Sequence, residues 1–524
     1  MSRYFVILFF ELLVAVVDAV FSHAEKVANV SAAVAARPNG SLLTLQRKPG
    51  ESHRIVRDAY KRDTHRIDIS ALSDIVSVDL ESETVVAEGR VTMQQLVRQL
   101  LPTYGRVPCV VPEFRHITVG GAAQGGAAES TSRSFGFFHD VVFAYEVVLG
   151  NGTVVNTARD GEHAALHHGL PATYGTLGIL TAATLQLCRA EPFVRLELRR
   201  WNSAAAAASY LTRPDPPDEK LPDFAEGIGF ADDFFMTVEG RYAVAAEAKG
   251  RGTSVRRFDG FLSPWFYKVV EREGQRLLAK IGGNVGGGEN NDPSGEGEAR
   301  RNYRTKNGKA STIFYTPTED YFFRHDRGAF WMVGTKLPHA LGRVLGPLLS
   351  SRKLMKVAAA FPKAVRKRTM LVQDFVLPAE NAPAFVRHLS VRLRLWPLWL
   401  LPIRNRQSAQ TLLAIPAPAD DRSFFVNVGA YGEPQNRENY TDFRRANREL
   451  ELLLTSLGGR KAFYAHAFYP REEFEALYNM TAYDDVREAY SAVNVFPDVF
   501  DKVVVPLVDG EQLVGNHLGE MEQR

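Results

Sequence analysis

Residues 112–136, with the sequence PEFRHITVGGAAQGGAAESTSRSFG, are the stretch that decides the fold. Glycines stand at positions 120, 121, 125, 126 and 136, with Ala, Ser and Thr between them. So little side-chain bulk lets the backbone approach a ligand closely. Successive backbone N–H groups can then face an anion such as a pyrophosphate. The chain has neither a Gly-Lys-Ser/Thr after these glycines nor a G-x-G-x-x-G anywhere, so neither a P-loop nor a Rossmann site is indicated.

The segments around this stretch predict short strands and one capped helix. Upstream, residues 24–37 predict a helix and residues 41–46, 75–78 and 84–87 predict strands. Thr92 is a predicted N-cap for a helix that begins TMQQLVRQLL. Downstream, residues 141–149 and 153–157 predict a hairpin around a type I′ turn at Asn151-Gly152. Residues 181–188 predict a further strand, so the first part of the chain is rich in β-structure.

The composition is that of a folded globular chain. The 524 residues include 45% hydrophobic and 23% charged residues, which favours two or three domains. A net charge of +3 argues against nucleic acid as a partner. Two cysteines, Cys109 and Cys188, are too few for a disulfide framework or a usual zinc site. This usage fits a reducing compartment.

The N-terminus carries an apolar segment. Residues 4–21 form an 18-residue run, near the lower limit for crossing a bilayer, and Glu11 and Asp18 interrupt it. A single-pass membrane anchor is the favoured interpretation. A cleaved signal peptide and a helix lying in the membrane interface remain alternatives. Arg3 and Lys26 flank the run on opposite sides, so the charges hardly decide its orientation.

The order of these motifs resembles the FAD-binding PCMH-type (vanillyl-alcohol-oxidase) family, whose two subdomains wrap the dinucleotide without a Rossmann fold. The resemblance implies an α+β fold, with this domain at 24–195 and a cap domain with an antiparallel sheet at 196–505. An N-terminal anchor at 1–23, a disordered insertion at 282–300 and a tail at 506–524 complete the expected organisation. FAD is expected to bind non-covalently, because Glu51 and Ser52 separate His53 from Gly50. The residues that the resemblance assigns to FAD are Lys48, Pro49, Gly50, Thr118, Val119, Gly120, Gly121, Ala122, Ala123, Gln124, Gly125, Gly126, Ala127, Ala128, Glu129, Ser130, Gly175, Gly178, Ile179 and Lys461.

Several second-domain stretches resemble the Δ24-sterol reductase (Diminuto-like) branch of that family. Among them are PWFYK at 264–268, VQD at 372–374, WPLWL at 396–400 and VGAYGEP at 428–434. The branch implies reduction of the C24–C25 double bond of a sterol, with NADPH as electron donor and no metal. It also implies an endoplasmic-reticulum membrane with the catalytic domain in the cytosol. The alternatives are another flavin oxidase of the family, such as an aldonolactone oxidase, and a non-enzymatic sterol-binding protein.

Reduction of an isolated double bond requires a proton as well as a hydride, so the site needs a general acid. Candidates are polar residues placed within or after apolar strands of the second domain. A buried carboxylate there keeps its proton when desolvation raises its pKa. The candidates are Asp374, Glu433, Tyr431 and His466, with Tyr464 as a further option.

Residues 327–373 contain ten Lys or Arg residues and no acid. Residues 337–349 within this region are apolar, and a basic cluster follows them. Apolar residues beside basic ones are typical of surfaces that dock on anionic membranes. The region therefore predicts a second membrane contact through which sterol enters, and an ordinary helix pair with a basic solvent face is the alternative.

Overall fold

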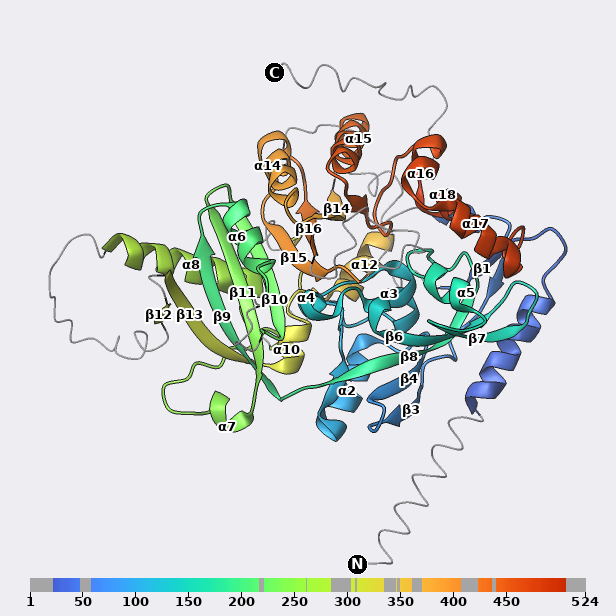
Figure 1. Ribbon diagram of the computed structural model, residues 1–524, viewed down its shortest axis with the longest axis horizontal. Coiled ribbons are helices and arrows are strands. Elements are labelled where there is room, and N and C mark those ends of the chain that lie inside the picture. The colour runs from blue at the N-terminus through green and yellow to red at the C-terminus, as the bar shows by residue number, and fades with distance from the viewer. Residues whose placement is uncertain are drawn as a thin grey trace, which may run out of the picture.

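The computed structural model describes residues 22–47, 58–215, 221–260, 262–283, 303–306, 309–333, 345, 349–360, 370–406, 423–435 and 440–505. Within them, two large sheets lie side by side, with helices around both (Figure 1). This is the α+β architecture that the sequence predicts. No helix of the described residues is long and apolar enough to cross a membrane, and the predicted anchor at residues 4–21 lies outside those residues.

The first sheet has six strands in the order β3-β4-β8-β6-β7, with β5 paired to β8. Its helices are α2 (Met93–Tyr104), α3 (Val119–Gly125), α4 (Ser132–Phe135) and α5 (Ala164–Gly169). A separate parallel pair, β1 (Leu43–Leu45) with β2 (His65–Ile67), packs with the helix at residues 22–35. The strands of the first sheet are β3 (Ile75–Asp79), β4 (Thr84–Glu88), β5 (Arg106–Pro108), β6 (Val142–Val148), β7 (Val154–Ala158) and β8 (Ile179–Arg189).

Local signals in this half are largely confirmed. Thr92 caps α2 and forms a capping box with Gln95, because Thr92 Oγ1 accepts from Gln95 N–H at 3.2 Å. The hairpin of β6 and β7 is present, but its predicted type I′ turn is wrong. Gly152 N–H donates to Leu149 O, and of the turn residues only Gly152 has a positive φ, +86°. Such a turn, followed by one left-handed glycine, is a three-residue loop with a G1 bulge.

The second sheet has nine strands in the order β12-β13-β9-β11-β10-β15-β16-β14-β17, all antiparallel to their neighbours. Helices α6 (Ala204–Leu211), α14 (Ala382–Leu393) and α15 (Tyr440–Ser456) cover one face (Figure 1). The other face turns toward the first domain and α8 (Phe266–Gly283). The strands are β9 (Phe193–Trp201), β10 (Phe224–Ala231), β11 (Phe234–Ala243), β12 (Tyr303–Lys306), β13 (Lys309–Pro317), β14 (Leu371–Pro378), β15 (Leu398–Arg404), β16 (Phe424–Gly432) and β17 (Arg460–Lys461).

The chain returns to the first domain at its end. Helices α16 (Arg471–Leu477), α17 (Met480–Ala489) and α18 (Val499–Val503) run beside α5 and the small β1–β2 sheet (Figure 1). Arg487 donates to the backbone oxygens of Thr176, Phe496 and Pro497, and Tyr483 Oη lies 2.7 Å from Thr176 Oγ1. The last helices therefore support the loop that precedes β8.

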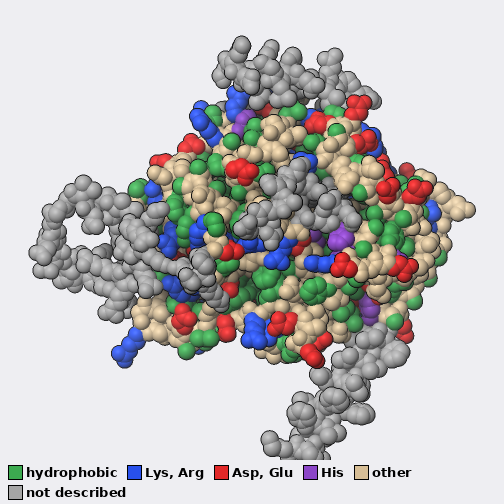
Figure 2. Space-filling view, in the orientation of Figure 1, with side chains coloured by type: hydrophobic (Ala, Val, Ile, Leu, Met, Phe, Trp, Pro, Cys, Tyr) green, Lys and Arg blue, Asp and Glu red, His purple; other side chains and the backbone are tan. Residues whose placement is uncertain are grey.

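The two cysteines are joined. Cys109 and Cys188 form a disulfide with a Cα–Cα distance of 5.0 Å, next to the pairing of β5 with β8. This bond was not predicted from the sequence, because the cysteines are 79 positions apart and strand pairing brings them together. On the face shown in Figure 2, acidic and basic side chains are interspersed among apolar ones, in line with the nearly balanced charge.

Candidate active site

The glycine-rich segment folds as a loop that enters a short helix. Thr118 caps α3, and its Oγ1 accepts from Gly121 N–H at 3.2 Å. Gly120 N–H donates to Gly89 O at 3.0 Å, and a Cβ on Gly120 would lie 3.1 Å from that oxygen. Glycine is therefore needed here for close approach of two backbones. The α-helical turn was not predicted, because Gly is a poor helix former and the Thr118 cap is local.

The segment that was expected to close around the cofactor does contact α3. Tyr174 N–H donates to Gln124 O at 3.2 Å, and Tyr174 Oη donates to Gly125 O at 3.2 Å. Tyr174 and Gly175 have positive φ values of +55° and +77°. Gln124 is buried, and its Nε2 has no hydrogen-bond partner among the described residues. A buried amide donor without a partner beside an unusual loop fits a polar ligand such as FAD.

Other residues assigned to the cofactor have different surroundings. A Cβ on Gly178 would lie 2.5 Å from Val147 Cγ1, so this glycine serves packing on β6. Ile179 opens β8 and is buried. Lys461 was expected near the flavin, but it is buried on the opposite face of the second sheet, where its Nζ lies 2.8 Å from Glu451 Oε1 of α15. Residues 48–50, which include Lys48, Pro49 and Gly50, lie outside the described residues.

A lysine that the sequence analysis missed lies near the same loop. Lys502 of α18 is largely buried, and its Nζ is 3.8 Å from where a Cβ on Gly175 would be. The same ammonium lies 5.2 Å from the centre of the Tyr60 ring. More than 300 residues separate Lys502 from Gly175, so only the return of the last helices brings the lysine here. Thr118, Gly120, Gly121 and Gln124 thus lie in or beside α3, with Gly175 next to Gln124 and Lys502 next to Gly175.

Two of the predicted acids lie together on the face of the second sheet that turns toward this segment. Alternation along β14 points Phe375 into the helix-covered core and Asp374 to the other face. Asp374 Oδ1 accepts from Tyr431 Oη at 2.7 Å and from Asn427 Nδ2 at 2.7 Å. Asp374 Oδ2 accepts from Tyr464 Oη at 2.8 Å. All three donors are neutral.

Gly429 explains how Tyr431 reaches Asp374. Gly429 lies directly opposite Asp374 in the register of β14 and β16, two residues before Tyr431. A Cβ on Gly429 would be 2.6 Å from Tyr431 Oη, so the tyrosine ring folds back over the glycine toward the carboxylate. Phe330 stacks on the other side of this ring, with centroids 4.3 Å apart, and Trp331 lies 5.8 Å away. The Tyr431 ring therefore lies beside an aromatic wall formed by Phe330 and Trp331, while its hydroxyl group bonds Asp374.

Burial favours the protonated form of the Asp374 carboxyl group. Loss of solvation raises the pKa of Asp374, and the hydrogen bonds from Asn427 and the tyrosines only partly oppose that rise. Glu113, near the start of the glycine-rich stretch 112–136, also has a raised pKa of about 8, first from desolvation and then from the negative charge of Glu129. The sequence analysis gave Glu113 no role, although its place in Pro112-Glu113 before the glycines marked it. Two carboxyl groups with raised pKa values therefore belong to this region.

The other two predicted acids are not in this cluster. His466 stacks on Phe468 with centroids 5.9 Å apart and meets Phe443 of α15, on the helix-covered side of the sheet. Glu433 follows the end of β16 and is exposed. Sequence alone did not separate these residues from Asp374, because each lies within or beside an apolar strand.

A second polar cluster, centred on Arg324, lies beside the Asp374 cluster and joins the two domains. Arg324, which follows α10 (Thr318–Phe322), lies 2.9 Å from Glu129 Oε1 and 2.7 Å from Glu226 Oε1 of β10. Glu226 Oε2 also accepts from Trp399 Nε1 at 2.8 Å and lies 3.1 Å from His325 Nε2. Glu129 was expected to contact FAD, but its carboxylate is committed to this ion pair. Ser130, also assigned to FAD, accepts Ala225 N–H through its backbone oxygen at 2.8 Å.

Comparison with known proteins identifies one matching family and several relatives. Residues 20–158 match the FAD binding domain family. The chain is 27% identical to the Δ24-sterol reductase of Homo sapiens over 452 residues, 85% of this chain and 78% of that protein. It is 26% identical to the Δ24-sterol reductase of Arabidopsis thaliana over 490 residues, 88% of this chain and 80% of that protein. A 125-residue stretch is 31% identical to the decaprenylphosphoryl-β-D-ribose oxidase of Mycolicibacterium smegmatis, 24% of this chain and 27% of that protein.

Proposed function

We propose that this member of the Δ24-sterol reductase family, an FAD-dependent oxidoreductase, reduces the C24–C25 double bond of a sterol side chain with electrons from NADPH. The observation that carries the proposal is the position of Asp374. It is a carboxyl group with a raised pKa whose hydrogen-bond donors among the described residues are all neutral, and it lies on the face of the second sheet that turns toward the glycine-rich segment. A proton donor is what an alkene without a neighbouring carbonyl requires.

FAD, when bound, supplies the hydride, and the protein supplies the proton. A proton added to C24 places the developing positive charge on the tertiary carbon C25, which then accepts the hydride. Asp374 is the proton reservoir, and the hydroxyl group of Tyr431 or Tyr464 passes the proton on. Both hydroxyl oxygens lie within 2.8 Å of the carboxyl group, which suits proton transfer.

The aromatic wall favours a sterol over a sugar lactone. Phe330 and Trp331 surround the Tyr431 ring, and Phe114 meets Phe330 with centroids 5.7 Å apart. These rings present mostly apolar surface to the several hydroxyl groups of a sugar, and an unpaired hydroxyl in such a site is costly. An apolar sterol side chain has no such cost there.

The decisive assay supplies a Δ24-unsaturated sterol and NADPH to the purified, FAD-loaded, full-length protein without oxygen. The expected product is the sterol with a saturated side chain, with one NADPH consumed per sterol. Turnover of an aldonolactone without turnover of the sterol would overturn the proposal in favour of a different flavin oxidase. A protein that binds sterol but purifies without flavin would overturn it in favour of a sterol-binding protein.

Membrane association is the remaining part of the proposal. In α12 (Ser351–Ala360), Lys353, Lys356 and Val357 are exposed, and the side chain of Val357 is 55% exposed. These residues fall within the basic, acid-free region, most of whose other basic residues lie outside the described part. Lys353→Glu with Lys356→Glu is expected to weaken binding to vesicles that contain anionic lipid, by roughly 1 kcal/mol per lysine removed. Unchanged sedimentation with such vesicles would contradict this contact.

A further inference from the structure

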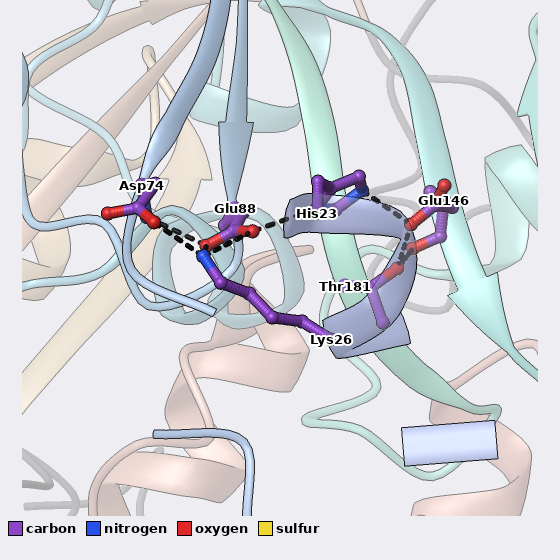
Figure 3. Close-up of polar contacts among 6 residues, drawn as sticks. All are labelled: His23, Lys26, Asp74, Glu88, Glu146 and Thr181. Atoms are coloured by element: carbon purple, nitrogen blue, oxygen red, sulfur yellow. Dashed lines mark hydrogen bonds and ion pairs between the residues drawn. The ribbon is translucent and has the colours of Figure 1, made fainter. Parts of the chain in front are cut away.

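The start of the helix at residues 22–35 carries two cations that reach the first sheet (Figure 3). His23 Nδ1 lies 2.8 Å from Glu88 Oε1, and His23 Nε2 lies 3.1 Å from Glu146 Oε1. Lys26 Nζ is 3.1 Å from each carboxylate oxygen of Glu88 and also bonds Asp74. The side chain of Glu88 is fully buried, whereas that of Asp74 is 63% exposed. Glu88 thus depends on the helix for its counter-charges.

The geometry fixes the charge of His23. Both ring nitrogens face oxygens of carboxylates, and an ionised carboxylate only accepts hydrogen bonds. Both nitrogens must therefore carry hydrogen, which makes the ring a cation. The hydrogen bonds to Glu146 and then to Glu88 raise the pKa of His23 to about 9, against the opposing effect of burial.

The two carboxylates flank a backbone junction that also holds the glycine-rich segment. Glu88 is bonded covalently to Gly89, and Glu146 accepts from Thr181 Oγ1 while Thr181 O accepts from Gly89 N–H at 2.7 Å. Gly89 O in turn accepts from Gly120 N–H at 3.0 Å. One peptide bond and one hydrogen bond thus connect Glu88 to Gly120, which Gly121 follows in the chain.

This junction leaves no room to absorb a shift. A Cβ on Gly89 would lie 2.6 Å from Leu180 O, and a Cβ on Gly120 would lie 3.1 Å from Gly89 O. Three backbones, at the end of β4, the start of β8 and the entry to α3, are therefore in close contact. Closely packed segments transmit a displacement instead of dissipating it.

We propose that His23 and Lys26 are positioning residues for FAD, which hold Glu88 and Glu146 and thereby set the place of Gly120 and Gly121. The helix that directly follows the apolar N-terminal segment is thus part of the cofactor site, and its docking and cofactor binding strengthen each other. The inference rests on FAD being the cofactor but not on the identity of the substrate.

The test measures FAD affinity in the full-length protein, after removal and re-addition of the cofactor. The double variant His23→Gln/Lys26→Met is expected to bind FAD about tenfold more weakly, a typical coupling between two linked sites. Hydrogen exchange of residues 22–35 is expected to slow when FAD is added to the wild-type protein, and less so in the variant. Glu25→Gln, on the exposed side of the same helix, is the matched control and is expected to change neither quantity.

A pH series tests the same proposal without disturbing the fold by substitution. The contribution of a cation with a raised pKa is full below the unfolded value of 6.5 and is lost as pH rises through about 9. FAD affinity of the wild-type protein is therefore expected to fall across pH 8 to 10. Lys26, whose pKa is raised above its usual 10.5, does not titrate in that window, and neither does Glu146, whose pKa is lowered. His23→Gln keeps a hydrogen-bond donor but does not titrate, so its affinity is expected to lack this step.

Equal FAD affinity of the folded double variant and the wild type would overturn the proposal. So would a wild-type affinity that is flat from pH 7 to 10, or a fall that His23→Gln shares. These outcomes are separable from failure of the sterol assay, since a protein that retains FAD but does not reduce sterol still reports on the coupling.

Discussion

Glu226 and Asp374 lie on the same face of the same sheet, yet their surroundings give the two carboxyl groups opposite chemistry. Burial alone raises the pKa of each. Around Glu226, the Arg324 guanidinium and then His325 more than reverse that effect and hold its pKa well below the usual range. Around Asp374, the donors in the described part of the chain are all neutral and the pKa stays raised. The charge of the partners therefore decides whether a buried carboxyl group is a structural ion or an acid.

Substitution of Asp374 should have the largest effect on turnover. Asp374→Asn keeps the size and hydrogen-bonding capacity of the side chain but has no acidic proton. Sterol reduction is expected to fall by roughly 10²- to 10⁴-fold, the range for loss of a general acid, with FAD still bound. Single-turnover oxidation of the reduced flavin by sterol is the measurement. If the variant kept wild-type turnover, the acid would lie elsewhere, with Glu113 as the next residue to test.

Substitution of Arg324 should act on stability instead. Arg324→Met leaves the carboxylates of Glu226 and Glu129 buried without their shared cation, which is expected to cost about 3–5 kcal/mol. Urea unfolding followed by circular dichroism measures this loss. Arg445→Gln, which breaks an exposed pair with Asp442, serves as control and is expected to cost less than about 1 kcal/mol. Equal costs for the two variants would mean that the buried pair does not hold the domains.

A smaller change should separate the tyrosine from its acid. A methyl group at position 429 would overlap Tyr431 Oη, so Gly429→Ala is expected to move the hydroxyl away from Asp374. Turnover is expected to fall by about tenfold to 100-fold, as for a misplacement near 1 Å. Flavin content and a crystal structure of the variant check the cause. Gly161→Ala, where the nearest side chain is 3.8 Å from the new methyl group, should behave as the wild type.

The smallest perturbation that distinguishes Asp374 from Glu226 is a change of pH. Asp374 must hold its proton to act, so kcat/KM for the sterol is expected to fall as pH rises through its raised pKa. Glu226 is ionised throughout and adds no step in that range. For stability the signs differ, because Glu226 has a depressed pKa and its contribution is lost only as pH falls below the usual range for Glu. An activity profile that rises with pH would contradict the role of Asp374.

Local sequence patterns predicted the secondary structure of the first domain well. The Thr92 capping box, the β6–β7 hairpin and the strands before α2 each depend on residues within a few positions of one another. The turn type at Gly152 was missed, because the register of β6 and β7 decided which residues occupy the turn. The glycine-rich segment was recognised from composition, whereas its helix depended on the Thr118 cap and on contacts with Gly89 and Val91.

In the candidate site, too, sequence motifs suggested the residues and tertiary contacts decided among them. Motif order pointed to Asp374 and Tyr431, but equally to Glu433 and His466, since an apolar strand surrounds each in sequence. Alternation along β14 and β16 then placed Asp374 and Tyr431 on one face, and helix packing turned His466 to the other. Lys461 and Glu129 were assigned to FAD from their positions in motifs. In the folded chain Lys461 forms an ion pair with Glu451, and Glu129 forms one with Arg324.

The sequence by itself indicated the α+β class and the FAD-binding segment, because its motif order resembles that of a known family. It also indicated an acid on a strand of the second domain, because apolar residues flank Asp374. The tertiary structure alone decided the Cys109–Cys188 bond, the approach of Lys502 to Gly175 and the partners of Glu226 and Asp374. Those features join residues 53 to more than 300 positions apart. The pKa of a buried group depends on which charges the fold places within a few ångströms of it. The sequence does not give the distances between those charges and the group.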